Sequence, residues 1–435
     1  MNGIFLFVVL LSFSVAAYRQ LIWIPAVGAA QAPMAAVSQA MIEAAGSAVT
    51  LAIGLVGVMA LFLGLMKVAE HGGLLVIIAR TMRPLMIKLF PDVPPEHPAM
   101  GAMILNLSAN ALGLGNAATP FGIRAMQELD RLNPHKGTAS NAMALFLAIN
   151  TSSVTLLPTG VIALRAAAGS ADPAGILPTT LFATLCSTTA AIIAAKTYQR
   201  FWAVSPTEFV PSPEGAATDP KLPASEGSLS AQTAQGYPTW VSLLVLGGVV
   251  GLIPVTILYG QTIAPWIVPA LMVSLLLFGA LRSVAVYEVF VEGAKEGFQV
   301  ALRIIPYLVA ILVAVSLFQA SGTMEWLIAP LGSITGHFGL PPEALPMAIL
   351  RPLSGSGAYG ILASVIQDPA IGPDSYTGYL VSTLQGSTET TFYVLAVYFG
   401  AVQVRRVRHA VAAALSADLV GIIAAVVICL YLFGG

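Results

Sequence analysis

Charged residues are scarce in this sequence of 435 residues. Only 9% are Asp, Glu, Lys or Arg, against about 25% in an average soluble domain, whereas 57% are hydrophobic. So few charges cannot cover a water-facing surface, and the sequence therefore predicts an integral membrane protein. The formal net charge of −1 gives no basic footprint, which argues against nucleic acid as a partner.

The residues and motifs of common catalytic and metal sites are also missing. The two cysteines, Cys186 and Cys429, lie in apolar segments and give neither a metal-ligand spacing nor a disulfide framework. There are five histidines, and no H-E-x-x-H, G-x-S-x-G or P-loop motif. We therefore expect no enzyme, no metal and no cofactor, apart from Na⁺ or H⁺ as a coupling ion. An intramembrane hydrolase using Ser and Glu stays open as an alternative.

Long apolar runs take the place of these features. A membrane-spanning helix needs roughly 20 mostly apolar residues. The candidate spans are Gly3–Tyr18, Gly46–Met66, Ser140–Leu164, Ile176–Lys196, Trp240–Tyr259, Ile263–Leu281, Val300–Phe318, Tyr379–Phe399 and Ala410–Phe433. Gly, Pro, Ser and Asn interrupt three further stretches, which we expect to be re-entrant or discontinuous helices: Leu74–Phe90, Pro98–Pro120 and Leu340–Ile366.

One segment differs in composition from the rest. Residues 203–237 are rich in Pro, Ser, Ala and Glu and show no apolar period, so we expect a disordered linker there. It would divide the chain into two membrane domains, residues 1–202 and 238–435.

The two predicted domains resemble each other. "PPEHPAMGAMILNLSANALGLG" from Pro94 is similar to "PPEALPMAILRPLSGSGAYG" from Pro341, and the segments around Glu43 and Glu292 also correspond. Further along, "INTSSVTLLP" aligns with "LQGSTETTFY". Three correspondences in one order indicate an internal duplication, although similar apolar stretches also arise by chance. Placing the basic residues 405–408 on the cytoplasmic side predicts that the two repeats are inverted.

The glycines of "LSGSGAYG" spell G-x-G-x-x-G, the fingerprint of a dinucleotide-binding turn. That turn needs a preceding strand and a soluble βαβ unit, whereas here the neighbours are membrane segments, so we reject this interpretation. Glycine instead allows a helix to break where a ligand approaches its backbone. The predicted helix-break glycines are Gly113, Gly115, Gly355, Gly357 and Gly360. Close helix packing of small residues is the alternative explanation.

A carboxylate within a membrane segment is the strongest sign of a functional site. Glu389 in "QGSTETT" directly precedes an apolar run, where burying its charge costs about 2.5–3.5 kcal/mol. Arg351 could pair with it, bind a substrate carboxylate, or extend to the membrane interface. Asp418 interrupts the last span and could relay a coupling ion or pair with Arg351. Arg165 and His71 are weaker candidates, and we expect both at the interface.

These motifs resemble known families. "LNLSANALGLGNAATPFGIRAMQELD" is similar to spore maturation protein A, whereas "RPLSGSGAYG" and "STLQGSTETTFYVLAVYFG" are similar to spore maturation protein B. The chain thus resembles a fusion of the two, both grouped with the nucleoside-recognition or "gate" domain. That domain resembles parts of concentrative nucleoside transporters and of ferrous-iron transporter B. The resemblance implies a multi-pass bacterial inner-membrane protein and solute transport. "STET" is similar in kind to the nucleoside-binding cluster of those transporters without being identical, which leaves the substrate open.

We therefore expect an all-α, polytopic protein with two gate-domain repeats and discontinuous helices around a central site. It would move a small polar solute, nucleoside-like, peptide-like or carboxylate, by alternating access, as a single chain or a homo-oligomer. A structural or assembly role in envelope or spore cell-wall maturation is the alternative. The predicted solute-binding residues are Asn106, Ser108, Asn110, Asn116, Asn150, Thr151, Ser152, Ser153, Arg351, Ser354, Ser356, Gln385, Ser387, Thr388, Glu389 and Thr390, with Glu389 and Asp418 as candidates for ion or proton coupling.

Overall fold

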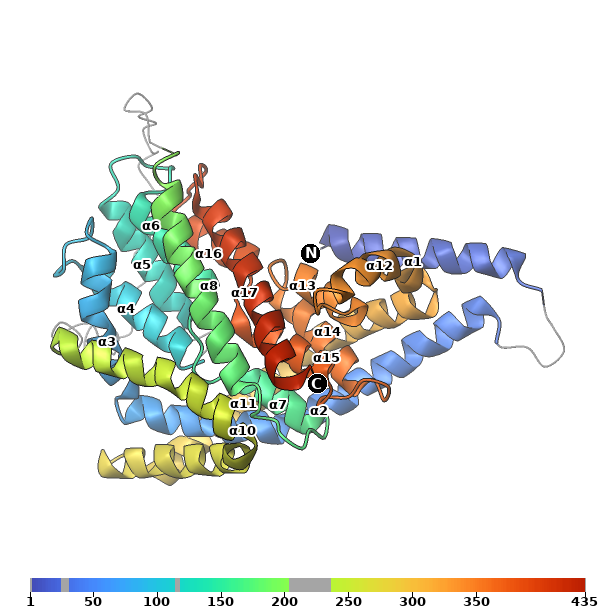
Figure 1. Cartoon of the computed structure of the whole chain (residues 1–435), viewed down its shortest axis with the longest axis horizontal. Coiled ribbons are helices and arrows are strands. Elements are labelled where there is room, and N and C mark those ends of the chain that lie inside the picture. Colours follow the sequence, from blue (N-terminus) through green and yellow to red (C-terminus); the bar gives the residue numbers. More distant parts are fainter. Residues whose placement is uncertain (1, 25–30, 114–117, 203–235, 435) are drawn as a thin grey trace.

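The computed structural model describes residues 2–24, 31–113, 118–202 and 236–434. Over these ranges the regular structure is helical, apart from an isolated bridge between Thr138 and Arg406. Almost all of the predicted linker, together with Gly115 and Asn116, lies outside the described residues. The all-α prediction is confirmed (Figure 1).

The helices before and after the predicted linker follow one another in a similar order. The first half contains α1 (Asn2–Ile22), α2 (Pro33–His71), α3 (Leu74–Leu89), α4 (Pro98–Ala111), α5 (Thr119–Arg131), α6 (Asn141–Thr151), α7 (Thr159–Ala167) and α8 (Leu177–Tyr198). The second contains α10 (Thr239–Leu281), α11 (Val286–Ala320), α12 (Thr323–Gly336), η2 (Pro342–Ala344), α13 (Leu345–Leu350), α14 (Gly355–Gln367), α15 (Tyr376–Ser387), α16 (Thr391–Ala401) and α17 (Ala410–Phe433).

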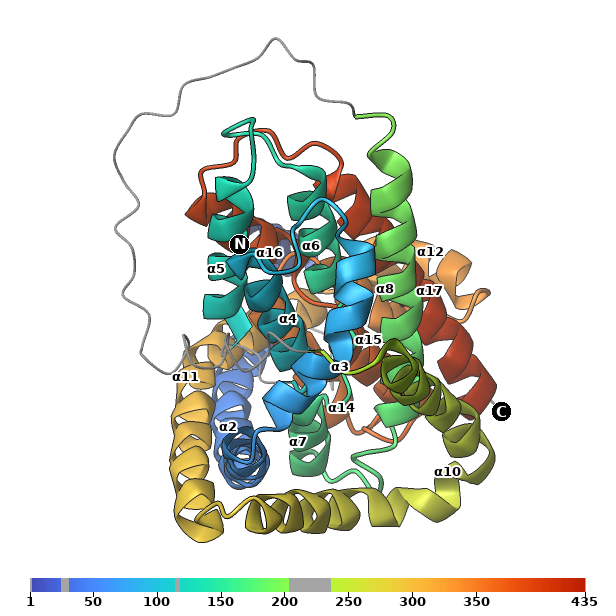
Figure 2. The same cartoon turned by 90° about the vertical axis from the view of Figure 1, so that its left-hand side faces the viewer.

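Equivalent helices of the two halves pack against each other in opposite directions. The long helices α2 and α11 lie side by side (Figure 2), with Gly64 against Phe290 and, one turn earlier in α2, Ala60 against Gly297. A Cβ atom at Gly297 would lie 2.7 Å from the Cα of Ala60, so the close approach depends on glycine. Because residue numbers rise along one helix as they fall along the other, the pair is antiparallel.

Helices α8 and α17 repeat this relationship (Figure 1). At one end, the Tyr198 hydroxyl lies 3.1 Å from the Ser416 hydroxyl. At the other end, Thr179 of α8 and Cys429 of α17 both hydrogen bond to the hydroxyl of Thr383. The end of α8 thus meets the start of α17, and the start of α8 meets the end of α17. Two antiparallel pairs of equivalent helices confirm the predicted inversion of the repeats.

Helix breaks interrupt both halves. The end of α4 at Ala111, with Leu112 and Gly113 after it, and the break at 351–354 fall inside the Gly- and Ser-rich stretches predicted to be discontinuous. Two others, at 152–158 and 388–390, divide Ser140–Leu164 and Tyr379–Phe399, for which a single continuous span was the wrong prediction. Conversely, the predicted spans Trp240–Tyr259 and Ile263–Leu281 belong to one continuous helix, α10.

Helix length and composition support a membrane location. Within the described ranges, Leu177–Tyr198 and Ala410–Phe433 are each long and apolar enough to cross a bilayer. A third candidate is the pair Val56–His71 and Leu74–Leu89, bent by 67°. At the bend Gly73 has a φ of +84°, a conformation that glycine adopts without strain.

The two largest buried cores combine residues of the two halves. One joins Met103 and Phe146 to Tyr398, whose ring stacks on Phe146 at 6.1 Å between centroids. The other joins Ile162 of α7 to Leu380 of α15. The two halves therefore bury much of their apolar surface against each other, which sets the positions of the broken helices described next.

Candidate functional site at the meeting of two helix breaks

The unanticipated breaks of the two halves meet in the interior. The backbone N–H of Glu389 donates to the carbonyl oxygen of Thr151 over 2.8 Å. Gly386 lies against the side chains of Thr180 and Pro158, where an added Cβ atom would come within 3.0 Å of Thr180. The last turn of α6 thus adjoins the break after α15, so polar clusters far apart in sequence come together.

Serine caps set the start of both helices that lead to these breaks. The Ser140 side chain accepts from the backbone N–H of Met143 at the start of α6, and Ser375 accepts from Gly378 at the start of α15. Such N-caps satisfy otherwise unpaired N–H groups. No equivalent partner exists within the helix for the carbonyls at its last turn, so groups outside the helix must supply one.

In the second half, Arg351 donates hydrogen bonds to the carbonyl groups at the end of α15. Its buried guanidinium donates from Nε to the Gln385 carbonyl over 3.1 Å, from Nη1 to the Thr390 hydroxyl over 3.0 Å, and from Nη2 to the Thr388 carbonyl. The predicted pairing with Glu389 is present at 3.7 Å, a distance longer than a hydrogen bond. Arg351 therefore holds the break at residues 388–390 in place, and its head group is buried inside the protein.

Ser354 and the glycines after it begin α14, next to the break at 388–390. The Ser354 hydroxyl accepts from the N–H of Gly357 over 3.0 Å as the N-cap of α14, and lies 3.5 Å from the Ser356 hydroxyl. At Gly355 an added Cβ atom would lie 2.8 Å from Thr390 Oγ1, so glycine allows the two breaks to approach. Gly360 is buried within α14. A helix turn, not a strand, precedes these glycines, in agreement with rejection of the dinucleotide interpretation.

The first half holds its own break through asparagine. Asn110 Nδ2 donates to Asn150 Oδ1 over 2.9 Å, and Asn150 Nδ2 donates to the Phe146 carbonyl over 3.0 Å. Leu156 also donates its N–H to the Ala111 carbonyl over 2.9 Å. Gly113 has a φ of +73°, and a Cβ atom there would meet the Leu157 carbonyl oxygen. The end of α4 and the segment after α6 are thus tied together.

The hydrogen bonds of the other predicted residues either join the two halves or stay within one half. Buried Asn106 donates to the Tyr398 hydroxyl of α16 over 3.0 Å and to the Ala118 carbonyl over 2.8 Å, which joins the halves. Ser108 donates to the Ile104 carbonyl and contacts the sulfur of Met82 on α3. We therefore place Ser108 on the α3 side. Three other hydroxyls bond the backbone of their own helices, those of Thr151, Ser152 and Ser387.

Among the residues that the structure describes, five buried polar atoms around the breaks have no hydrogen-bond partner. They are Asn106 Oδ1, Ser153 Oγ, Thr180 Oγ1, Gln385 Oε1 and Asp418 Oδ1. An unpaired buried polar atom costs about 1–3 kcal/mol, so native interiors rarely leave one without reason. These five atoms are groups to which a polar solute or an ion could bind. A cavity of about 430 Å³ elsewhere, lined among others by Asp92, His135 and Arg408, shares no residue with this set.

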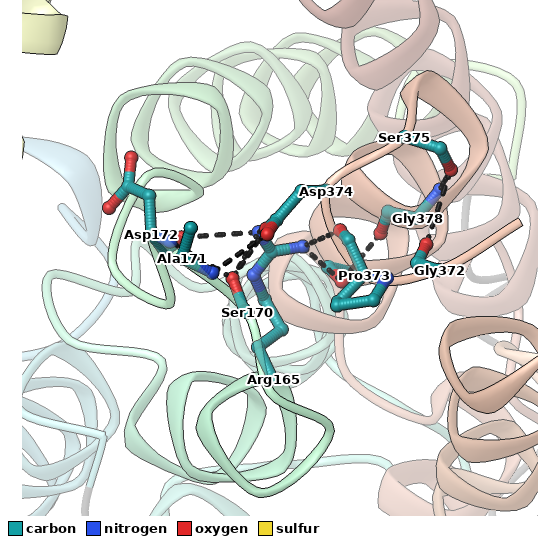
Figure 3. Close-up of polar contacts among 10 residues, drawn as sticks. Arg165, Ser170, Ala171, Asp172, Gly372, Pro373, Asp374, Ser375 and Gly378 are labelled. Carbon is teal, nitrogen blue, oxygen red and sulfur yellow. Dashed lines mark hydrogen bonds and ion pairs between the residues drawn. The ribbon is translucent and has the colours of Figure 1, made fainter. Parts of the chain in front are cut away.

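Arg165 is a buried residue that joins the two halves. Its side chain is 0% exposed, donates to the carbonyls of Pro373 and Asp172, and pairs with Asp374 at 3.0 Å (Figure 3). The guanidinium also lies 4.2 Å from the centroid of the Tyr379 ring. Its partners from the second half lie over 200 positions away, so local sequence gave no signal for this cluster.

Burial shifts the pKa values of Asp172 and His409, which lie outside the spanning helices. Burial raises the pKa of Asp172, in the loop after α7, although the charge of Arg165 opposes the shift. Burial, followed by the charge of Arg408, lowers the pKa of His409 at the start of α17 to about 4. Both groups lie where a loop of one half packs against the other half.

Comparison with known proteins agrees with this duplicated geometry. The family described as nucleoside recognition matches residues 52–168 and again 301–405, together about half of the chain. The two matches begin with the same spacing as the Glu43 and Glu292 segments, so the internal duplication is confirmed.

Individual relatives match different parts of the chain. Spore maturation protein A of Bacillus subtilis is 51% identical over 36% of this chain and 80% of its own length. Spore maturation protein B of the same organism is 44% identical over 38% of this chain and 93% of its own length. Inner membrane protein YjiG of Escherichia coli is 28% identical over 23% of this chain and 62% of its own length. No solved structure is significantly similar. The chain therefore belongs to the nucleoside recognition family of membrane proteins, and it joins in one polypeptide the counterparts of spore maturation proteins A and B.

Proposed function

We propose that this chain moves a small polar solute across the bacterial inner membrane by alternating access, and that the solute binds between the breaks at 152–158 and 388–390. The observation that carries the proposal is the cluster of unpaired polar atoms where these breaks meet. Broken helices within a membrane are tolerated only where protein buries them or where they line a wet cavity. Inverted repeats with such breaks near the midplane are typical of secondary transporters.

The chemistry of the site favours a solute rich in hydrogen-bonding groups. Asn106 and Gln385 offer amide oxygens, Ser153 and Thr180 offer hydroxyls, and Glu389 has a half-exposed carboxylate at 50% side-chain exposure. Nucleosides, short peptides and carboxylates satisfy such groups. We propose binding and transport at the site and not a chemical reaction, because the hydroxyls of Thr151, Ser152 and Ser387 donate to backbone carbonyls and not to a general base.

Ligand-dependent stability of the purified protein tests the proposal. Pools of nucleosides, peptides with muropeptide fragments, and dicarboxylates are added to the detergent-purified chain, and Tm is followed by tryptophan fluorescence. A ligand at 100 times its Kd adds about 2.7 kcal/mol of stability. We expect one pool to raise Tm for the native chain and for Glu288→Gln, an exposed control, but not for Glu389→Gln. The compound in that pool that raises Tm is then tested for uptake into liposomes that contain the protein.

The names of the relatives favour a second candidate, a structural role in envelope or spore maturation. In that case a flat ligand screen is expected for a well-folded protein. Glu389→Gln would then retain full function in the cell, whereas substitutions on lipid-exposed helix faces would remove it.

A further inference from the structure

Asp418 on α17 is a buried carboxyl group set apart from the Arg351–Glu389 pair. It is 3% exposed, its Oδ2 accepts from the Thr391 hydroxyl over 2.7 Å, and its Oδ1 has no partner. Glu389 is half exposed and lies within ion-pair distance of Arg351. Environments this different indicate different roles for the two acidic side chains.

No side chain balances a negative charge on Asp418 by contact. Among the described residues no Lys, Arg or His forms an ion pair with it, and Arg351 is the charged group whose field acts on it. The N–H groups of Arg351 are directed to Gln385, residues 388–390 and the Glu389 carboxylate. The helices packed against this part of α17 (α6, α8, α15 and α16) contribute hydroxyl groups, as in the bond from Ser187 to the Ala417 carbonyl.

A carboxylate inside a membrane protein requires a counter-charge, because burying an isolated ion costs many kcal/mol. We propose that Asp418 is the binding site for a coupling ion, a proton or a monovalent cation such as Na⁺, and that Glu389 contacts the solute. The coupling role of the ion rests on the proposed transport function, whereas ion binding at Asp418 does not depend on it. An ion on Oδ1 would satisfy the unpaired oxygen and the charge together.

The position of Asp418 lets the ion act on the solute site. Thr391, its hydrogen-bond partner, is the first residue of α16 and directly follows the break at 388–390. Gly421, less than one turn further along α17, lies against Thr388, where an added Cβ atom would be 3.0 Å away. Contacts from α17 thus reach both ends of the break that Arg351 holds. Ion binding or release at Asp418 would change these contacts and move the break.

Infrared spectroscopy tests the proton form of the proposal without any solute. Difference spectra of the purified full-length protein between acid and alkaline pH are compared for the native chain, Asp418→Asn, Glu389→Gln and Glu288→Gln. If a proton binds, we expect the C=O stretch of a protonated buried carboxylic acid to disappear only in Asp418→Asn.

Cation-dependent stability tests the other form. Tm is measured for the same four proteins in NaCl, KCl and choline chloride at constant ionic strength. If Na⁺ binds, we expect NaCl alone to raise the Tm of the native chain and both glutamate variants, and to leave Asp418→Asn unchanged.

The outcomes separate this inference from the transport proposal. If neither the infrared band nor the Na⁺ effect distinguishes folded Asp418→Asn from the native chain, the inference is wrong, whether or not solute moves. Should Asp418→Asn not fold, Thr391→Val keeps the carboxyl and removes its hydroxyl partner. We then expect ion affinity to change about tenfold, and an unchanged affinity overturns the proposal equally.

Discussion

The peptide N–H of Glu389 and the carbonyl oxygen of Thr151 form a hydrogen bond of 2.8 Å between the two inverted halves. Each residue lies at the end of a broken helix, so this bond links the polar cluster of one repeat to that of the other. A shift of either break therefore changes the geometry of both half-sites, which is the coupling that alternating access requires.

Replacing Arg351 tests whether its planar donor group holds the second break. Arg351→Lys keeps the charge but cannot reach both the Gln385 and Thr388 carbonyls and the Thr390 hydroxyl with fixed geometry. We expect a loss of about 2 kcal/mol or more, because buried acceptors are left unpaired. Thermal unfolding in detergent measures it. The exposed Arg405→Lys is the control, and an equal effect at both positions would contradict this role for Arg351.

Substitution of Gly355 tests the close approach between the breaks. Gly355→Ala brings a methyl group to 2.8 Å from Thr390 Oγ1 and so displaces the hydroxyl that accepts from Arg351. We expect lower Tm and weaker ligand stabilisation. Gly101→Ala, with open space around its Cβ position in α4, is the control and should be neutral or stabilising by about 0.5–1 kcal/mol. Similar losses in both variants would argue for a general effect of alanine.

The raised pKa of Asp172 predicts that its ionised carboxylate lowers stability at neutral pH. Its pKa is raised by burial, so its protonated form is favoured in the folded state and its contribution to stability is lost as pH rises through the raised value. We expect Asp172→Asn, which removes the charge, to raise Tm at neutral pH and to have little effect in acid. A gain that is the same at both pH values would not fit this explanation.

His409 predicts a pH effect in acid. Its pKa is lowered from 6.5 to about 4, so the neutral ring is favoured in the folded state. Its contribution is present above pH 6.5 and is lost as pH falls towards 4, by up to about 3 kcal/mol. His409→Gln should flatten the dependence of Tm on pH in this window. The exposed His337→Gln should leave it unchanged, and a flat native profile would rule out the effect.

The interlocked cores predict that the connecting segment is dispensable for assembly. Residues 1–202 carrying an affinity tag and untagged residues 238–435, expressed together, should purify as one complex, because both cores contain side chains from both halves. Co-expressed Gly297→Leu in the second fragment should weaken the complex, since Gly297 touches Ala60. Recovery of the tagged fragment alone would show that covalent connection is needed.

Much of the architecture follows from local sequence. The composition gives a helical membrane protein, and the runs around Gly113 and Gly355 give two of the breaks, because Gly, Ser and Pro interrupt apolar stretches that are too short to span. The internal similarity gives the duplication. Arg351 and Glu389 stand out because each is isolated in apolar sequence, and the structure places them within ion-pair distance.

The remaining features depend on contacts between distant residues. The breaks near Ser153 and Glu389 were not predicted, because the flanking apolar runs are long enough to resemble continuous spans. Within "NTSSVT" and "GSTETT" the polar residues were visible, but the side chains that bond the segments next to these breaks, Asn110 and Arg351, lie on other elements. Nothing adjacent to Arg165 indicates that its acidic partner is Asp374.

Burial of Arg165 by the second half has a consequence for biosynthesis. Three of its partners, Pro373, Asp374 and Tyr379, are synthesised roughly 200 residues after it, so the first half leaves the ribosome with only Ser170 and Asp172 as partners of the guanidinium and with an open end after α7. Contacts of such sequence separation form late. The first half would therefore wait in a loosely packed state until α15 is inserted, and a chain truncated before residue 373 should be degraded rapidly in the cell.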